Sequence, residues 1–263
     1  MVDSTSGHPA GGEGAVAVVI PARDEAARVA ATVRAVRGLP RVRHVVVVDD
    51  GSLDATARSA AAAGAIVLRH ARSRGKAAAL TTGADRVARL DAAAGLPPSL
   101  LLFVDADLGD SAAATGALTG PVAAGEADMT VAVLPPQAAP GGGRGLVVRL
   151  ARLGIRNATG FVATQPLSGM RCLTRAAFDA ARPLAHGWGV ETALTIDLLT
   201  AGLRVQEVPC DLHHRVTGRD WAAQRHRAAQ FRDVARALAV RRVRRAMPLR
   251  VLRVTRGFTR PGA

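Results

Sequence analysis

The sequence predicts an α/β protein with a doubly wound, mostly parallel sheet in a single domain. Two apolar runs, 45–48 and 100–104, each lead into paired aspartates, as buried strands of a parallel sheet lead into turns. Segments of strand and helix character alternate through the first half of the chain, which favours parallel strands with right-handed crossovers. At 263 residues the chain can bury a sizeable core, and one domain with additions accounts for this length.

Each expected element rests on a local pattern. Valines recur at helical spacing within 25–37, and two adjacent prolines at 97–98 interrupt the chain before the strand at 100–104. The segment 135–145 is too rich in proline and glycine for regular structure and is read as a loop. The expected strands are 15–20, 45–48, 65–69, 100–104, 129–134 and 204–212. The expected helices are 25–37, 52–63, 76–91, 146–158, 190–201 and a long arginine-rich one at 220–245.

Composition is typical of a globular protein, with 49% hydrophobic residues and a mean hydropathy of +0.16. No apolar stretch reaches the length of a membrane-spanning helix. Residues 1–14 are polar and glycine-rich, and they read as a disordered leader without a secretory signal. Cys172 and Cys210 lack metal-ligand spacing and are expected to be buried thiols of a reducing compartment. We therefore expect a cytoplasmic protein.

The formal net charge is +14, and only Lys76 among the 35 basic residues is a lysine. The segment 241–263 carries arginines but no acidic residue. It can be a solvated end, or it can bind anionic lipid headgroups at the inner face of the membrane. Phe258 is the only aromatic residue among these arginines, so single-stranded nucleic acid is not an expected partner.

Aspartates at the carboxyl ends of parallel strands point to a ligand site, because ligands of open α/β sheets bind at that edge. Asp49 and Asp50 follow one apolar run, and Asp105 and Asp107 follow the other. Carboxylate oxygens are ligands that Mg²⁺ and Mn²⁺ prefer. The alternative is that each pair only forms a turn or caps a helix.

Lys76 opens an expected helix directly after Arg74 and Gly75, at a position where a phosphate group could sit. Arginine's planar fork cannot replace a compact ammonium group everywhere, so a lone lysine invites a functional interpretation. The alternative is that this lysine persists by chance.

Five motifs occur in the order found in family 2 type glycosyltransferases of the GT-A fold, which the chain resembles over roughly 15–220. They are Ile-Pro-Ala-Arg-Asp-Glu at 20–25, Val-Val-Asp-Asp-Gly-Ser at 47–52, Arg-Gly-Lys at 74–76, Val-Asp-Ala-Asp at 104–107 and the pair Gln-Pro-Leu-Ser-Gly at 165–169 with Gly-Trp-Gly-Val-Glu at 187–191. The last pair is similar to acceptor-side motifs of glucosyl-3-phosphoglycerate synthases and of polyprenyl-phosphate sugar transferases. The remaining segment, 221–263, is an expected arginine-rich helix and tail.

The resemblance implies a role for each matching residue. Those that would bind the nucleotide are Pro21, Arg23, Glu25, Asp50, Ser52, Lys76 and Asp105. Those that would hold Mg²⁺ or Mn²⁺ are Asp105, Asp107 and His214, with His213 pointing to the opposite face of its strand. The alternative is that His213 and His214 are both surface residues of an arginine-rich loop. Those that would lie on the acceptor side are Ser168, Gly169, Arg171 and Gly189. Those that would act in catalysis are Glu191 and Asp107.

The role of Glu191 has several alternatives. It can take the proton of an acceptor hydroxyl, orient sugar or acceptor hydroxyls, or favour the N-terminus of the helix that follows Gly189. A phosphate acceptor is already ionised and needs no base. Thr192 stands where the common inverting pattern has a second acid, which leaves base catalysis open.

The resemblance implies a nucleotide-sugar-dependent hexosyltransferase that moves glucose from UDP-glucose to a small phosphorylated acceptor such as 3-phosphoglycerate. Arginines near the acceptor-side motifs (Arg149, Arg152, Arg156 and Arg171) favour an anionic acceptor, and for each a solvated charge is the alternative.

Three alternative function classes are a polyprenyl-phosphate sugar transferase, a non-catalytic basic binding protein and a dinucleotide oxidoreductase. A polyprenyl-phosphate acceptor would bring the enzyme to the membrane surface, and a non-catalytic basic binding protein would leave the acid pairs unexplained. A dinucleotide oxidoreductase is disfavoured, because Pro-Ala-Arg-Asp-Glu stands where that class has a Gly-x-Gly-x-x-Gly motif.

Overall fold

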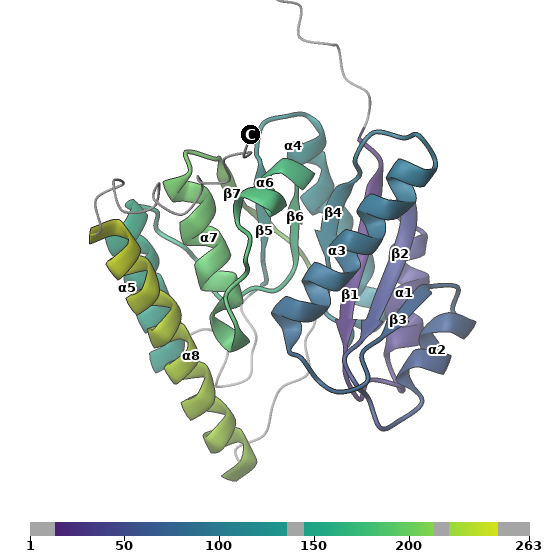
Figure 1. The fold of residues 1–263 in the computed structure, drawn as a ribbon, viewed down its shortest axis with the longest axis horizontal. Coiled ribbons are helices and arrows are strands. Elements are labelled where there is room, and N and C mark those ends of the chain that lie inside the picture. The colour runs from purple at the N-terminus through teal and green to yellow at the C-terminus, as the bar shows by residue number, and fades with distance from the viewer. Residues whose placement is uncertain (1–13, 136–144, 213–220, 247–263) are drawn as a thin grey trace, which may run out of the picture.

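The computed structural model describes residues 14–135, 145–212 and 221–246, and in the last range the side chains of 228–242. Within these ranges one seven-stranded sheet runs in the order β3-β2-β1-β4-β6-β5-β7 (Figure 1). The strands are β1 (Val16–Ala22), β2 (Val42–Asp49), β3 (Ile66–Arg69), β4 (Leu100–Phe103), β5 (Met129–Val133), β6 (Arg171–Leu173) and β7 (Val205–Pro209).

The sheet is parallel except for β6, which pairs antiparallel with both β4 and β5. Val19 of β1 lies between Val46 of β2 and Phe103 of β4, so these three strands end at one edge. The chain leaves β1 toward β2 on one side and returns to β4 on the other. Ligands of such sheets bind at this reversal, beyond the carboxyl ends of the strands.

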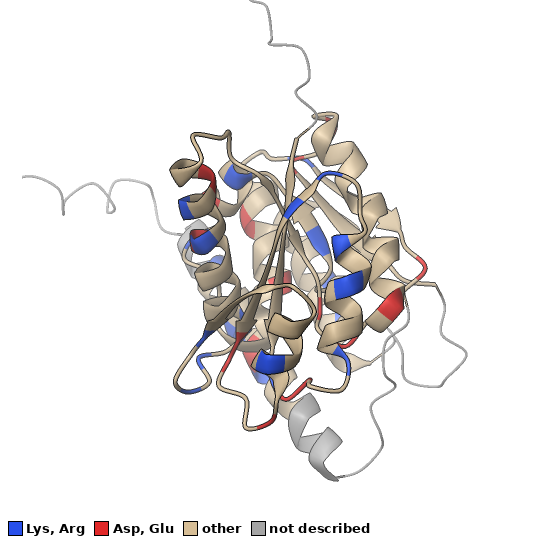
Figure 2. Cartoon of the chain, turned by 90° about the vertical axis from the view of Figure 1, so that its right-hand side faces the viewer, with Lys and Arg blue, Asp and Glu red and all other residues tan. Residues whose placement is uncertain are grey.

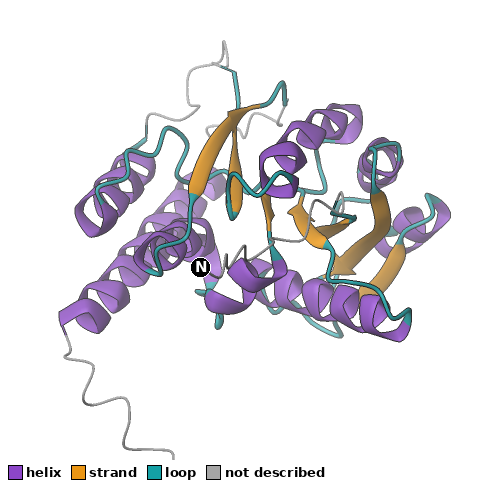
Figure 3. Ribbon diagram, turned by 90° about the horizontal axis from the view of Figure 1, so that it is seen from above, coloured by secondary structure: helices purple, strands orange, loops and turns teal. Residues whose placement is uncertain are grey.

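Helices cover both faces of the sheet (Figure 3). Alternate residues of β1 face opposite cores: Val18 and Ile20 pack into one cluster, and Ala17 and Val19 pack into the other. The helices are α1 (Val29–Arg37), α2 (Thr56–Ala62), α3 (Lys76–Ala93), η1 (Gly109–Leu118), α4 (Thr119–Ala123), α5 (Leu146–Thr159), α6 (Arg175–Ala180), η2 (Gly187–Gly189), α7 (Val190–Thr200) and α8 (Trp221–Ala246). The predicted α/β class and doubly wound sheet are confirmed.

Two predicted helices begin four residues late, for the same reason. The helix expected from 25 begins at Val29, and the helix expected from 52 begins at Thr56. The intervening residues use their amide groups to join the two loops, as with Glu25, whose amide donates to Thr56 Oγ1 at 2.8 Å. These bonds between the loops precede both helices, which begin only after them.

The elements that were not predicted are β6, η1, α4, α6 and η2. Strand β6 is only three residues long, too short for a periodic pattern, and it starts with the charged Arg171. It runs antiparallel to β4 and β5, so it does not follow the alternating strand–helix pattern from which parallel strands were predicted. Both cysteines are free and buried, as expected, and burial raises the pKa of Cys172 to about 12.

Helix α8, the predicted arginine-rich helix, packs against α5 and α7. A Cβ at Gly154 of α5 would lie 2.3 Å from Leu238 Cδ2 of α8, so the two helices approach closely at this glycine. Arg241 Nε of α8 donates to Asp197 Oδ1 of α7 at 2.8 Å. None of the described helices is long and apolar enough to cross a membrane.

Candidate functional site

The predicted nucleotide-binding residues gather where β1, β2, β3 and β4 end. These carboxyl ends of the strands lie at the bottom of Figure 2, where several acidic residues are found. Arg23 and Glu25 leave β1, Asp50 and Ser52 leave β2, and Asp105 leaves β4. The fold therefore brings these segments to one edge, as the strand-end argument expected.

The β1–α1 and β2–α2 loops are bonded directly to each other. Ser52 Oγ accepts the Asp24 amide at 2.9 Å, and Asp24 Oδ1 accepts the Leu53 amide at 2.8 Å. Ser52 is only 2% exposed. Its hydroxyl holds Asp24, and through it the segment of Arg23 and Glu25, against the neighbouring loop.

Asp50 organises the β3–α3 loop. Its Oδ1 accepts the Arg74 amide and pairs with His70 Nδ1, at 2.8 and 2.6 Å. Its Oδ2 accepts Ser73 Oγ–H and the Gly75 amide, at 2.7 and 2.8 Å. Burial alone would raise the pKa of Asp50, yet these four hydrogen bonds lower it to about 2. The carboxylate thus fixes the loop that leads into Lys76, and its predicted contact near the base stays a prediction.

Gly51 shows how closely the β2–α2 and β3–α3 loops approach. Its φ is +76°, and a Cβ there would lie 2.7 Å from the Ser73 amide nitrogen. Only glycine satisfies both conditions without strain. His70 belongs to this arrangement and was missed by the sequence analysis, although it follows β3 just as Asp50 follows β2.

Lys76 joins the two halves of the candidate site. Its Nζ lies 2.8 Å from Asp105 Oδ1 and 2.9 Å from Glu191 Oε1. Burial by itself would lower the pKa of Lys76, but the two carboxylates outweigh it and raise the pKa. Glu191 is 7% exposed in the first turn of α7. The structure therefore turns this carboxylate toward Lys76 and the strand-end acids.

Gly169 closes the cluster from the acceptor-side segment. A Cβ on it would lie 2.4 Å from Lys76 Nζ and 2.8 Å from Asp105 Oδ2. The backbone of the Gln-Pro-Leu-Ser-Gly segment thus lies directly against the ion pairs. Only a residue without a side chain fits here without displacing them.

Asp105 and Asp107 are suited to a hard divalent cation, because such ions prefer carboxylate oxygens. Both side chains are half-buried after the end of β4. Among the described residues, no group of three histidine, cysteine or acidic side chains is close enough to hold a metal. The third predicted ligand, His214, lies outside these residues, as does His213. The metal site therefore stays a prediction. The carboxylates of Asp105 and Asp107 have suitable chemistry for it.

Arg171 takes a different place from the predicted one. It is 1% exposed within the sheet, and its guanidinium donates to Ser168 O, at 2.9 Å from Nε, and to Thr195 Oγ1, at 2.9 Å from Nη1. A side chain enclosed in this way does not face an acceptor. The expectation of a direct acceptor contact is corrected: Arg171 supports the acceptor-side segment from behind.

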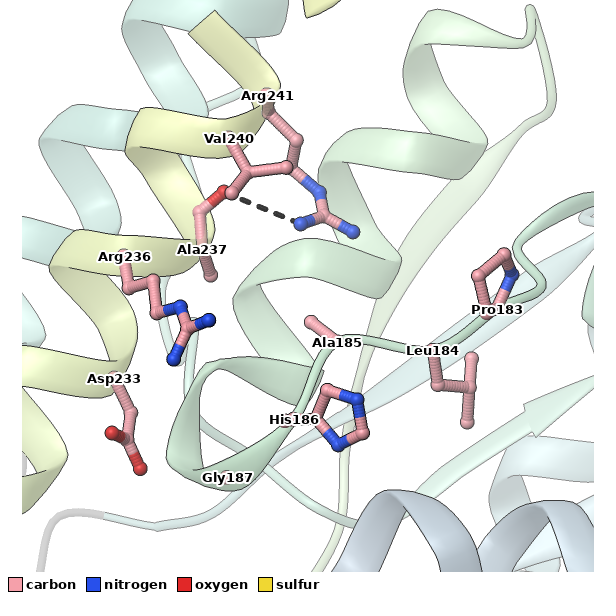
Figure 4. Close-up of a pocket in the computed structure, with 10 residues that line it drawn as sticks. All are labelled: Pro183, Leu184, Ala185, His186, Gly187, Asp233, Arg236, Ala237, Val240 and Arg241. Carbon is pink, nitrogen blue, oxygen red and sulfur yellow. Dashed lines mark hydrogen bonds between the residues drawn. The ribbon is translucent and has the colours of Figure 1, made fainter. Parts of the chain in front are cut away.

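Gly189 is the contact point of α8 on the acceptor side. A Cβ at Gly189 would lie 2.7 Å from both Asp233 O and Ala237 Cβ. The Trp188 amide donates to Asp233 Oδ2 at 3.3 Å. Helix α8 therefore supports the segment that ends in Glu191. A cavity of about 300 Å³ lies between the preceding residues, Pro183 to Gly187, and the same helix (Figure 4).

The arginines of α5 divide into two kinds. Arg152 donates to Ala163 O and Thr164 O, at 2.9 and 2.7 Å, and so holds the backbone before the acceptor-side segment. Arg149 and Arg156 are exposed, as solvated charges would be.

Comparison with known proteins adds a family and several solved relatives. The family model described as glycosyl transferase family 2 matches residues 17–179. An uncharacterized protein of Methanocaldococcus jannaschii, MJ1222, is 27% identical over 73% of this chain and 79% of its own.

The solved structures include glucosyl-3-phosphoglycerate synthase from Mycobacterium tuberculosis. Its complex with phosphoglyceric acid has a TM-score of 0.69 and 28% identity, covering 87% of this chain and 80% of that one. Its complex with Mn²⁺, UDP-glucose and phosphoglyceric acid has a TM-score of 0.66 and 26% identity, covering 87% and 79%. Its complex with Mg²⁺ and UDP has a TM-score of 0.68 and 26% identity, with the same coverage.

Proposed function

The chain belongs to glycosyl transferase family 2, and we propose that it transfers glucose from UDP-glucose to a small phosphorylated acceptor such as 3-phosphoglycerate. It is a nucleotide-sugar-dependent glycosyltransferase of the GT-A fold. The observation that carries the proposal is the cluster of Lys76, Asp105 and Glu191, with Gly169 against it.

The donor side is proposed from the strand-end loops. The solved relative binds UDP or UDP-glucose together with Mn²⁺ or Mg²⁺. In this chain Asp105 and Asp107, with His214, would hold such an ion, which when bound neutralises the charge developing on the leaving diphosphate. The predicted nucleotide contacts of Pro21, Arg23, Glu25, Asp50 and Ser52 belong to the same proposal.

Lys76 and Glu191 supply the chain's own electrostatics at the point of transfer. The ammonium of Lys76 offsets the repulsion that two neighbouring carboxylates would otherwise feel. We assign to Glu191 the orientation of an acceptor hydroxyl, with proton removal at Oε1 where the acceptor is a hydroxyl rather than an ionised phosphate. Its buried, charge-paired position supports this role.

The acceptor is proposed to approach Ser168, Gly169 and Gly189. Phosphoglyceric acid is bound by the solved relative, which supports a small anionic acceptor here. Polyprenyl phosphate is the second candidate. One observation favours it: Leu146 and Leu153 of α5 are 72% and 54% exposed beside the exposed Arg149 and Arg156, a mixture suited to a membrane surface.

The decisive experiment offers labelled UDP-glucose with Mn²⁺ or Mg²⁺ to two acceptors, 3-phosphoglycerate and undecaprenyl phosphate, and partitions the products between water and butanol. A new labelled anion in water supports the proposed acceptor. Label in butanol instead assigns a polyprenyl acceptor and a membrane-surface enzyme. No transfer to either acceptor, with UDP-glucose binding intact, contradicts both.

A matched pair of variants ties the result to the cluster. Asp105→Asn changes an acid paired with Lys76, whereas Asp110→Asn changes an exposed acid outside the cluster. Transfer should fall in the first variant and persist in the second.

A further inference from the structure

Arg171 is a buried charge held by neutral groups. Besides Ser168 O and Thr195 Oγ1, its guanidinium donates to Pro166 O at 3.4 Å and lies 3.8 Å from the sulfur of Met129. Among the described residues no carboxylate lies within ion-pair distance of it. Burial lowers the pKa of Arg171 to about 10, although the more distant carboxylates of Glu191, Glu207 and Asp105 act to raise it. Burying a charge without an ion-pair partner lowers stability, so Arg171 is expected to have a role besides packing.

The acceptors of Arg171 belong to two separate parts of the site. Pro166 and Ser168 lie in the Gln-Pro-Leu-Ser-Gly segment, and Thr195 lies one turn into α7. The Thr195 hydroxyl in turn donates its proton to Glu191 O at 3.0 Å. A continuous path of hydrogen bonds therefore runs from the acceptor-side segment through Arg171 and Thr195 to the backbone of Glu191.

Both ends of this path meet again at Lys76. Gly169, the residue after Ser168, lies against Lys76 Nζ, and the Glu191 carboxylate pairs with the same nitrogen. The planar guanidinium offers five N–H donors in a fixed fork, so it can hold several carbonyl and hydroxyl acceptors at set positions.

We propose that Arg171 is a positioning residue: through Thr195 it sets the place of Glu191 relative to the 165–169 segment. For catalysis this rests on the proposed function, because Glu191 must stand within reach of the acceptor that this segment would hold. The arrangement of the two segments itself does not depend on which substrate is used.

The first test uses hydrogen exchange on the full chain. Thr195→Val removes the hydroxyl and keeps the shape of the side chain. Thr200→Val is the control for loss of an intrahelical hydroxyl bond, because the exposed Thr200 donates to Ile196 O and Asp197 O, at 2.7 and 3.1 Å, further along α7. In Thr195→Val, peptides covering 165–170 should exchange about tenfold faster than in the wild type. In Thr200→Val they should exchange at the wild-type rate.

Equal exchange over 165–170 in the two variants would overturn the proposal. So would an acceleration in Thr195→Val spread evenly over the whole chain, since that would indicate general loss of stability. Arg171→Met is the obvious variant but removes the partner of several buried acceptors, so Thr195 carries the test.

The second test measures turnover. Thr195→Val should lower kcat about tenfold with an unchanged KM for the donor, and Thr195→Ser, which keeps the hydroxyl, should restore it. Equal kcat in Thr195→Val and wild type would remove the catalytic part of the proposal. A wild-type protein that transfers no sugar would contradict the proposed function, whereas the exchange result would still decide the positioning role.

Discussion

The ammonium nitrogen of Lys76 lies 2.9 Å from a carboxylate oxygen of Glu191, although Lys76 begins α3 and Glu191 lies in the first turn of α7. The same nitrogen lies 2.8 Å from Asp105 at the end of β4. A single positive charge therefore connects the segment that would hold the nucleotide with the segment that would face the acceptor. The contact gives the only lysine in the chain a defined place.

Replacing this lysine by arginine should impair the enzyme although the charge is kept. In Lys76→Arg the larger planar group must fit between Asp105 and Glu191 with Gly169 directly against it. We expect kcat/KM to fall about tenfold or more, measured by label transfer from the nucleotide sugar. Wild-type activity in this variant would mean that any cation suffices at this position.

Gly169→Ala tests the same cluster from the acceptor side. The new Cβ would lie 2.4 Å from Lys76 Nζ, so the lysine must move away from one of its carboxylates. Activity should fall at least about tenfold while the variant stays folded, as judged by circular dichroism. Gly120→Ala is the control, because a Cβ there meets nothing within 4 Å and should leave activity intact.

Asp107→Ala tests the proposed metal site. Loss of a predicted ligand should reduce turnover at least about a hundredfold, because the charge on the leaving diphosphate would lose its counter-charge. The measurement is label transfer over a range of Mn²⁺ concentrations, compared with the exposed-site variant Asp110→Ala. An Asp107→Ala enzyme with normal turnover and normal Mn²⁺ dependence would argue that the metal is held elsewhere.

Asp50 should make stability depend on pH below neutrality. Its pKa falls from 3.8 to about 2 in the folded chain, so the ionised carboxylate stabilises the fold above about pH 4, and this contribution is lost as the pH falls toward 2. Asp50→Asn should therefore cost about 1–2 kcal/mol at pH 7, with about half of this difference gone at pH 3. Urea unfolding of both proteins at pH 7, 5 and 3 measures it, and a difference that is constant with pH would contradict the assignment.

The attachment of α8 can be tested at two adjacent arginines. Arg241 is 9% exposed and pairs with Asp197 of α7, whereas Arg242 is exposed. Arg241→Met should lower the free energy of unfolding by about 1–3 kcal/mol, because it leaves Asp197 without its partner. Arg242→Met should change the free energy of unfolding by less than about 0.5 kcal/mol. Equal effects in urea unfolding would mean that the ion pair does not hold the helix.

The strands and helices with a clear local pattern could be predicted from the sequence, and those defined by distant partners could not. The valine run at 45–48 lies within β2, and the run before Asp105 forms β4. Strand β6 could not be predicted, because it has only three residues and its extended conformation depends on pairing with β4 and β5. The starts of α1 and α2 could not be predicted, because the residues before each helix bond to the loop of the other.

The candidate site shows the same division. The order of motifs located Lys76, Asp105, Gly169 and Glu191, but nothing local indicated that one nitrogen would pair with two carboxylates. Arg171 was assigned by its neighbourhood in sequence to the acceptor, whereas the alternation of β6 turns its side chain into the core. Thr195 and His70 contact Arg171 and Asp50, respectively, and no sequence motif marked either of them.

The contact of α8 with Gly189 has a consequence for the order in which the molecule is made. During synthesis the strands of the sheet and Glu191 are added to the chain before residues 221–246. During that interval Gly187 to Gly189 lack the helix against which they pack. The strands β1 to β4 and their loops can thus fold early. The segment that contains Glu191 is supported only after α8 has emerged.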